Sequence, residues 1–525
     1  MKTNRFLLIL MISLNIQFIL PAQQLQEGGY QIFDTINLSG TVLINNDLFI
    51  DSNEILIIAP GSILEFQGHY QIKVVGLVKA IGTEADSIIF TINDNASFSD
   101  SSTIAGGWKG INFWDRNEND TSFFSYCRFE YGKCVTSSNS DKDSKGGAIF
   151  LSNYSGIWVS NCTFNNNLAT KEGGGIYSYE TSVNIITDNI FTHNKTYHYG
   201  GGIKIQFGNN IYIANNLFQY NTAFNSYNGW QSGEGSGINI NTGLSNANIE
   251  VYNNKLFNNT SLSTLYESCN DYLITNNIIC NNYGAAFYSG HSMTYGKFIN
   301  NTVSNNYLEY FSGITIWSRH IQIKNNIIWN NISIVNDTIQ IFDRSSLGAD
   351  IEYNCVQYGY EGNGNIKDPP MFVNPTKGAG LNYNGTDADW SLLDSSPCIN
   401  TGTPDTSGLN LPEFDIDGNQ RVYGNRIDMG AYENQYVWVK INDSPVFNNS
   451  ITVYPNPGTN VLNLKTINEV LDLELINING QTVIKQMVDN NYQTINTELL
   501  KSGIYFYRLI NKQNNTIETG KWIKK

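Results

Sequence analysis

Residues 173–221 read GGGIYSYETSVNIITDNIFTHNKTYHYGGGIKIQFGNNIYIANNLFQYN, almost two copies of one phrase. The glycine runs at 173–175 and 200–202 start 27 residues apart, and so do the runs Asp188–Phe191 and Asn215–Phe218. Between them stand short alternating runs, such as IKIQF from Ile203 to Phe207, which have the period of a β-strand. A unit this short cannot bury its own apolar face, so it must stack on neighbouring units. The stretch predicts a solenoid of β-strands.

The same phrase extends in both directions. The glycine run has further copies at 146–149 and 235–238, and the asparagine run at 161–164, 276–279, 300–303 and 325–328. Extra residues around 228–234 indicate a loop inserted between two coils. Helix signals are nearly absent, while glycine and asparagine suit turns with left-handed backbone angles. Propellers need longer units, and leucine-rich solenoids need their leucine pattern. We therefore predict an all-β protein built on a right-handed parallel β-helix.

Stacking predicts the direction of the side chains. Equivalent residues of adjacent coils lie roughly 4.8 Å apart. Ile149, Ile176, Ile203 and Ile238 are then expected to form an inward ladder, and the repeated asparagines to hydrogen-bond to their copies along the turns. Residues 40–92 alternate less regularly and are expected to form earlier coils and an N-terminal cap, as solenoid ends require.

The first 22 residues have the order of a secretory signal peptide. Lys2 and Arg5 precede a largely apolar run at 6–20, and Ala22 supplies a small residue at the end. The run is too short for a membrane span, and no later segment reaches that length. The mature chain is therefore expected to have no transmembrane segment.

Composition limits the partners and the cofactors. The net charge of −15 gives nucleic acid little electrostatic reason to bind. Seven cysteines do not make a disulfide framework, although Cys127 with Cys134, or Cys355 with Cys398, could pair. No spacing indicates a metal site. Asp415, Asp417 and Asn419 lack the distal glutamate of a calcium loop, so ordinary turn chemistry is favoured there.

The coil motifs carry a resemblance to a known family. The Gly-Gly-Gly-Ile and Asn-Asn-x-Phe phrases, with Gly106-Gly-Trp-Lys-Gly-Ile111, resemble the pectin-lyase-like right-handed β-helix superfamily over roughly residues 30 to 350. The motifs specify a fold and not an activity. Pectate-type lyases of this superfamily use a basic residue as proton abstractor together with calcium, so the resemblance leaves the cofactor open, calcium included.

Two further resemblances divide the rest of the chain. The segments 368–375, 396–400, 415–421 and 426–432 resemble the choice-of-anchor type of closing segment. Residues 450–457, the hairpin signal at Asn479-Gly480, residues 500–509 and the basic end 520–525 resemble the C-terminal sorting domain of type IX secretion cargo. That resemblance implies export across the outer membrane through the type IX machinery, removal of the tail and attachment to the cell surface.

The predicted order has five parts. They are a signal peptide at 1–22, a β-helix at 23–350, a closing segment at 351–436, a linker at 437–449 and a small antiparallel β-sandwich at 450–525.

Alternation also predicts a stripe on the outside of the coils. If Ile176 and Ile203 face inward, their neighbours face solvent. Aromatic rings stack on sugars and amides meet hydroxyls, so the stripe is predicted to bind a polysaccharide or cell-surface glycan. The alternative is a solvated face whose large residues only support strand pairing. The predicted substrate-binding residues are Phe150, Tyr177, Tyr179, Gln206 and Trp317.

Lys204, His198 and Glu234 are the predicted catalytic residues. They lie near the glycine phrases of neighbouring coils, with His193, Lys171 and Glu172 nearby in the sequence. A base beside carboxylates suits polysaccharide lyase or glycoside hydrolase chemistry. Charged residues on turns are more commonly only solvated, so whether the chain is an enzyme stays open. The competing hypothesis is a noncatalytic structural or adhesive surface solenoid.

Overall fold

The computed structural model describes residues 34–435 and 452–525, apart from gaps at 117–119, 136–141, 228–229, 244–246, 291–294, 309–312, 336–337, 466–470, 490 and 512–515. The predicted signal peptide and linker lie outside the described residues. The chain divides into two compact units, with the boundary between Gln435 and Tyr436. The described residues contain no helix long and apolar enough to cross a membrane.

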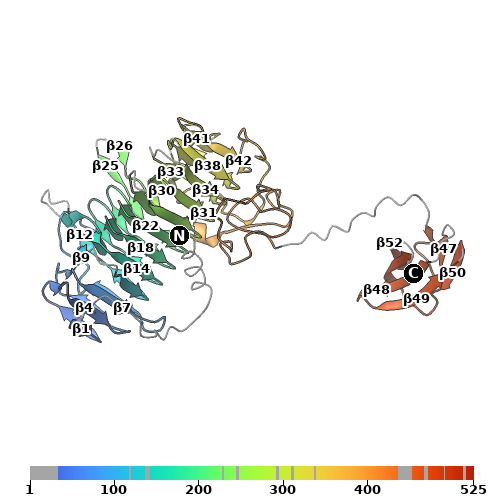
Figure 1. Ribbon diagram of the computed structural model, residues 1–525, viewed down its shortest axis with the longest axis horizontal. Coiled ribbons are helices and arrows are strands. Elements are labelled where there is room, and N and C mark those ends of the chain that lie inside the picture. The colour runs from blue at the N-terminus through green and yellow to red at the C-terminus, as the bar shows by residue number, and fades with distance from the viewer. Residues whose placement is uncertain are drawn as a thin grey trace, which may run out of the picture. The chain divides into compact units, whose positions relative to one another are not determined.

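The first unit is a coil of three parallel sheets, here called A, B and C, which the chain visits in that order (Figure 1). Sheet A contains β1 (Asp34–Leu38), β4 (Glu54–Ile58), β7 (Leu77–Ile81), β10 (Ser122–Ser125), β14 (Gly156–Ser160), β18 (Val183–Thr187), β22 (Asn210–Ala214), β28 (Asn248–Tyr252), β31 (Tyr272–Thr275), β34 (Tyr295–Ile299), β38 (His320–Lys324) and β42 (Asp350–Glu352). Sheet B contains β2 (Thr41–Ile44), β5 (Ile63–Phe66), β8 (Ile88–Ile92), β11 (Cys127–Glu130), β15 (Thr163–Asn165), β19 (Ile190–Thr192), β23 (Leu217–Gln219), β29 (Lys255–Phe257), β32 (Ile278–Cys280), β35 (Thr302–Ser304), β39 (Ile327–Trp329) and β43 (Cys355–Val356).

Sheet C runs along the third side, and in many coils it takes two strands. It contains β3 (Leu48–Ile50), β6 (Ile72–Val74), β9 (Ile111–Arg116), β12 (Lys133–Cys134), β13 (Ile149–Tyr154), β16 (Leu168–Ala169), β17 (Ile176–Tyr179), β20 (Lys195–Thr196), β21 (Ile203–Gln206), β24 (Thr222–Ala223), β27 (Ile238–Asn241), β30 (Thr260–Ser268), β33 (Tyr283–Ser289), β36 (Tyr307–Leu308), β37 (Ile314–Ile316), β40 (Ile332–Ser333) and β41 (Ile341–Asp343). A short 3-10 turn at Lys142–Ser144 precedes β13.

Two rows of buried asparagines join the coils. One row stands at the turn between sheets A and B, and the other at the turn between B and C. In the first row, the backbone N–H and the Nδ2 of Asn216 both donate to Oδ1 of Asn254, at 3.0 and 2.9 Å. Its Nδ2 also donates to the carbonyl of Ile186, at 2.9 Å. The same pattern repeats from Asn189 to Asn354 in one row and from Asn167 to Asn331 in the other.

The interior between the sheets is apolar. The predicted ladder of Ile149, Ile176, Ile203 and Ile238 is confirmed, because all four are fully buried and pair in register. Phenylalanines of the Asn-x-x-Phe phrase stack beside it, with ring centroids 4.6 Å apart for Phe164 and Phe191. Such burial is the main favourable term in folding.

Residues after β43 fold back along the outside of sheet B. This closing segment contains β44 (Phe372–Asn374), a 3-10 turn at Gly385–Asp387 and β45 (Asp389–Leu392). Trp390 and Met429 pack with the outward-facing Phe257, Ile278 and Ile327 of sheet B. The segment therefore covers a side of the later coils.

On the later coils, the asparagine directly before a member of a buried asparagine row fastens this cover. These residues have positive φ, 55° at both Asn258 and Asn300, so their side chains point outward. Nδ2 of Asn258 donates to the carbonyl of Tyr383 at 2.7 Å, and Nδ2 of Asn300 to that of Asp428 at 2.8 Å. The backbone N–H of Thr403 donates to Oδ1 of Asn325 at 2.7 Å.

The second unit contains two antiparallel sheets. One is made of β46 (Thr452–Tyr454), β47 (Val461–Lys465) and β50 (Tyr492–Asn496), and the other of β48 (Leu471–Asn477), β49 (Thr482–Val488), β51 (Gly503–Asn511) and β52 (Thr516–Lys524). Leu462, Leu473 and Trp522 share one buried core. The predicted hairpin is confirmed, with Gly480 at φ 78° between β48 and β49.

The predicted fold class is confirmed, as a parallel β-helix followed by an antiparallel sandwich. All seven cysteines are buried free thiols. Of the two pairs suggested by the sequence, Cys355 does lie beside Cys398. Cys127 lies beside Cys162 and not Cys134, with its backbone N–H 3.3 Å from Sγ of Cys162. The reason is stacking, which brings residues one coil apart together.

Replacing Asn254 with leucine is expected to destabilise the β-helix by about 3 kcal/mol or more. The substitution removes the acceptor of Asn216 and the donor to the carbonyl of Ile213, and each buried group left unpaired costs about 1–3 kcal/mol. Urea denaturation followed by circular dichroism measures the change. The matched control is Asn253→Gly, next to it at φ 55°, where glycine has no conformational penalty. Equal midpoints for Asn254→Leu and wild type would show that the row contributes no stability.

Candidate functional site

Sheet C carries a row of outward-directed residues on six strands. Register pairs Phe150 with Tyr177, Tyr177 with Lys204 and Lys204 with Asn239, and Tyr266 and Tyr288 continue the row. The neighbouring isoleucines point inward, so the predicted direction of these side chains agrees with the register. The candidate site is the part of this row around Lys204.

The exposure of this row differs from expectation. Phe150, Tyr177 and Lys204 are only 3%, 2% and 4% exposed, so the prediction that Tyr177 and Lys204 face solvent is wrong. The rings of Phe150 and Tyr177 stack with centroids 5.5 Å apart. The residues that precede each glycine turn form a second layer beside the row. They pair in register in the order Lys145, Glu172, Tyr199 and Glu234.

Lys204 is a buried cation with few partners. Its Nζ donates to Oδ1 of Asn239 at 2.6 Å and lies 5.5 Å from the ring centroid of Tyr199. Burial lowers the pKa of Lys204 to about 8, although the charges of Glu172 and Glu234 act in the opposite direction. An appreciable fraction of this amine is therefore neutral near pH 8.

Glu234 is the carboxylate beside this amine. Burial raises the pKa of Glu234 to about 7, although the charge of Lys204 lowers it. The pKa values of the two groups are thus brought close together near neutral pH, as acid–base catalysis requires. Glu234 is held by its backbone, since its N–H donates to the carbonyl of His198 at 3.0 Å and its carbonyl accepts from Gly200 at 3.1 Å.

A second cation, Lys145, lies in the second layer, two coils before Lys204. Nζ of Lys145 is 3.2 Å from Oε2 of Glu172 and 3.3 Å from the hydroxyl of Tyr177. The Tyr177 hydroxyl donates to Oε1 of Gln206 at 3.2 Å. This chain of contacts fixes Gln206 at the edge of the site, where it is partly exposed.

The predicted residues are only partly brought together. Lys204, Glu234 and His198 lie at one end of adjacent coils, with His198 exposed and its ring 6.2 Å from that of Tyr199. Tyr179 pairs in register with Gln206. Trp317 follows β37, four strands from β21, which is on the order of 19 Å at about 4.8 Å per strand.

His193 lies elsewhere. It occupies the turn between sheets B and C at φ 55°, where its ring stacks on Tyr220 at 5.1 Å.

Sequence reasoning missed Lys145 and Tyr199 as members of the site. A signal for both is present, because Lys145, Glu172, Tyr199 and Glu234 each stand directly before a glycine phrase. Aligning the phrases one residue earlier would have placed these four in one row.

The inserted residues before Glu234 form a hairpin and not a simple loop. It consists of β25 (Asn225–Tyr227) and β26 (Trp230–Ser232), contacts β30 and projects from the coils (Figure 1). A hollow of about 260 Å³ lies away from this site, between Ser304, Trp329 and residues 369–376.

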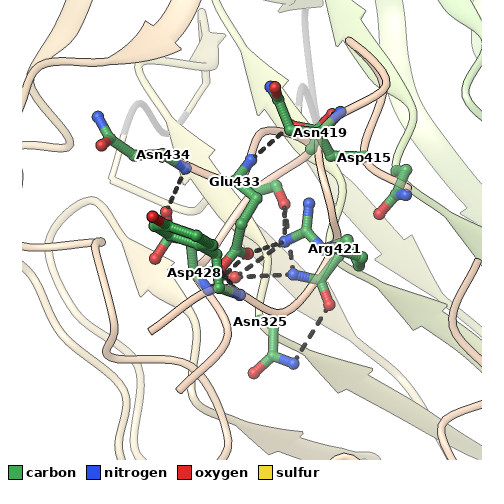
Figure 2. A network of polar contacts seen from close by, with 12 residues as sticks. Asn325, Asp415, Asn419, Arg421, Asp428, Glu433 and Asn434 are labelled. Atoms are coloured by element: carbon green, nitrogen blue, oxygen red, sulfur yellow. Dashed lines mark hydrogen bonds and ion pairs between the residues drawn. The ribbon is translucent and has the colours of Figure 1, made fainter. Parts of the chain in front are cut away.

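A second polar centre lies in the closing segment. Figure 2 shows the buried Arg421 among three carboxylates, with Nη2 3.4 Å from Oε2 of Glu433. Burial raises the pKa of both Asp428 and Glu433. The carboxylate of Asp415 accepts backbone N–H groups of Asn419 and Glu433, both at 2.8 Å. Among the described residues, no group of three or more His, Cys, Asp or Glu side chains could hold a metal ion. Arg421 is a fully buried cation whose charge interacts with Glu433, Asp428 and Asp415.

Glu234→Gln is expected to remove part of the pH dependence of stability. Between pH 4.5 and about 7 the folded protein keeps a proton that the unfolded chain has lost, so stability falls as pH rises through this window. The contribution is roughly 3 kcal/mol, at about 1.36 kcal/mol per pKa unit. Urea midpoints at pH 5 and pH 8 measure it, with the exposed Glu180→Gln as charge-matched control. If the Gln variant keeps the full wild-type difference, Glu234 does not titrate in this window.

Residues 452–525 match a family model described as the secretion system C-terminal sorting domain. No curated protein matches the chain. The matched range covers almost all of the second compact unit. The type IX sorting domain predicted for the tail is therefore confirmed, and it indicates a protein that is secreted or displayed at the cell surface.

Proposed function

We propose that this exported chain binds polysaccharide on the outer face of sheet C and processes it with Glu234. In this proposal the chain enters the export route through the signal peptide at 1–22, and its β-helix belongs to the pectin-lyase-like superfamily. The observation that carries the proposal is the proximity of the buried Lys204 and the partly exposed Glu234, two groups of opposite charge with converging pKa values. Groups with such shifts concentrate at functional sites.

Because Lys204 is buried, the sugar contacts other residues of the site. A sugar reaches the partly exposed Glu234, the exposed His198 and Tyr199, which is 38% exposed. Tyr199 offers a ring for stacking, and Gln206 an amide for hydroxyl groups. Lys204 acts beneath them, where its charge stabilises the ionised form of Glu234. Glu234 is thus the catalytic residue of the proposal, and Lys204 is a positioning residue.

A second function, a noncatalytic adhesive solenoid, is favoured by the packing of the stripe. Phe150 and Tyr177 are stacked and buried, so these two rings are engaged with each other and not free for sugar. In that case the face supports the sheet, and Lys204 with Glu234 is a structural pair.

Polysaccharide processing is tested with the mature chain and a panel of acidic and neutral polysaccharides, with and without calcium. Unsaturated products and reducing ends are measured. Glu234→Gln is expected to lower turnover by about 10²-fold or more, the usual scale of general acid–base catalysis. Lys204→Met is expected to shift the pH profile, because the pKa of Glu234 rises when the cation is lost.

His193→Gln is the control, since His193 lies on another turn. Product formation that survives Glu234→Gln would exclude Glu234. Binding without any product would favour the adhesive solenoid.

A further inference from the structure

The outer face of sheet A carries an apolar row of its own. Register aligns Phe123 on β10, Trp158 on β14, Ile185 on β18 and Tyr212 on β22. Their strand neighbours, such as Phe124, Ile157 and Ile186, are buried in the core, so the row points outward. Trp158 is 37% exposed, and its ring lies 5.9 Å from that of Phe123. We call these four residues the sheet A stripe.

A row of hydroxyl groups runs alongside the stripe. Ser125, Ser160 and Thr187 stand two residues further along the first three strands and pair with one another in register. The hydroxyl of Ser160 donates to that of Ser125 at 3.3 Å. Ser125 and Ser160 are partly exposed, whereas Thr187 is buried, so β10 and β14 offer an apolar side chain and a hydroxyl on the same face.

The face is free of charge over four coils. No residue of β10, β14, β18 or β22 is Asp, Glu, Lys or Arg, in a chain of which 15% is charged. The uncharged run ends at Lys79 on β7 and at Glu250 on β28, which occupy the same row. At about 4.8 Å per coil, the stripe is roughly 14 Å long.

The closing segment covers a different part of the coil. It packs on sheet B from β23 onward, where Nε2 of Gln219 donates to Oδ1 of Asn384 at 3.1 Å. It reaches sheet A at β34, where Nζ of Lys297 donates to the carbonyl of Gly408 at 2.6 Å. Trp158 lies on β14, on an earlier coil than these contacts. This exposed tryptophan is therefore not part of the contact that holds the closing segment.

We propose that the sheet A stripe is a binding surface for a neutral polysaccharide. The exposed ring of Trp158, with the half-buried Phe123 beside it, gives a stacking partner for a sugar face. Ser125, Ser160 and Asn210 give partners for sugar hydroxyls. An acidic polymer gains nothing from an uncharged face and is repelled by the net charge of −15. A protein partner fits less well, because a stable interface needs about 800 Å² from each side and a row four residues long supplies far less.

This surface is separate from the site on sheet C. The sheet A stripe is proposed to bind a polysaccharide, whereas Glu234 is proposed to act on a polysaccharide at sheet C. Either proposal can therefore fail while the other holds. When both hold, one polysaccharide is contacted by two faces of the same coil.

Affinity electrophoresis of the full mature chain tests the stripe, in gels that contain mannan, xyloglucan, mixed-linkage β-glucan or polygalacturonate. Retardation by at least one neutral polymer and not by polygalacturonate is expected. Trp158→Ala is expected to weaken that retardation at least tenfold, and Phe123→Ala to weaken it less, because its ring is partly covered by Trp158.

Phe49→Ala is the matched control, since Phe49 is an exposed aromatic residue, 53% exposed, on β3 of sheet C. His193→Gln, on the turn between sheets B and C, should also leave retardation unchanged. Thermal melting of each variant checks that the coil is folded. Lack of retardation of the wild type by all three neutral polymers overturns the proposal. Unchanged retardation of folded Trp158→Ala also overturns it, as does a Trp158→Ala effect on self-association in sedimentation without an effect on glycan.

Discussion

The hydrogen bond from one asparagine side chain to the next is the interaction on which the coil depends. A turn inside a parallel β-helix buries backbone and side-chain polar groups away from water, and such groups must find partners. The buried polar groups at the turns are satisfied by asparagines such as Asn216 and Asn254. One residue type suffices because a side-chain amide has two N–H donors and an oxygen that can accept two hydrogen bonds. The spacing of the coils is thus set at the turns as well as in the sheets.

A residue with positive φ precedes each member of the buried asparagine rows, and on the later coils it is commonly a second asparagine. At φ near 55° it turns the chain and directs its own side chain outward. On the later coils those side chains bind the closing segment, through Asn258, Asn300 and Asn325. On these coils, two adjacent asparagines therefore stabilise the interior and hold the cover.

The coil was predictable from the sequence because glycine and asparagine phrases recur at the length of one coil. The inward isoleucines followed from alternation alone. The alternation of residues along a strand predicts which way each side chain points, but not which side chains of other coils it contacts. It therefore could not show that Tyr199 lies over Lys204 or that Phe150 and Tyr177 stack on each other. It also did not single out Glu267, an inward carboxyl on β30 that accepts from the backbone N–H of Cys269 at 3.0 Å. Burial raises the pKa of Glu267 to about 8. These features depend on contacts between coils.

The closing segment also has a mechanical consequence. It lies between the coils and everything that follows Gln435, so a pulling force applied to the tail is delivered first to this segment. The segment crosses several coils, and its bonds to Asn258, Asn300 and Asn325 are loaded together. Peeling the last strand from the stack would instead break bonds one after another. A strap of this kind spreads tension over the side of the solenoid and protects its open end.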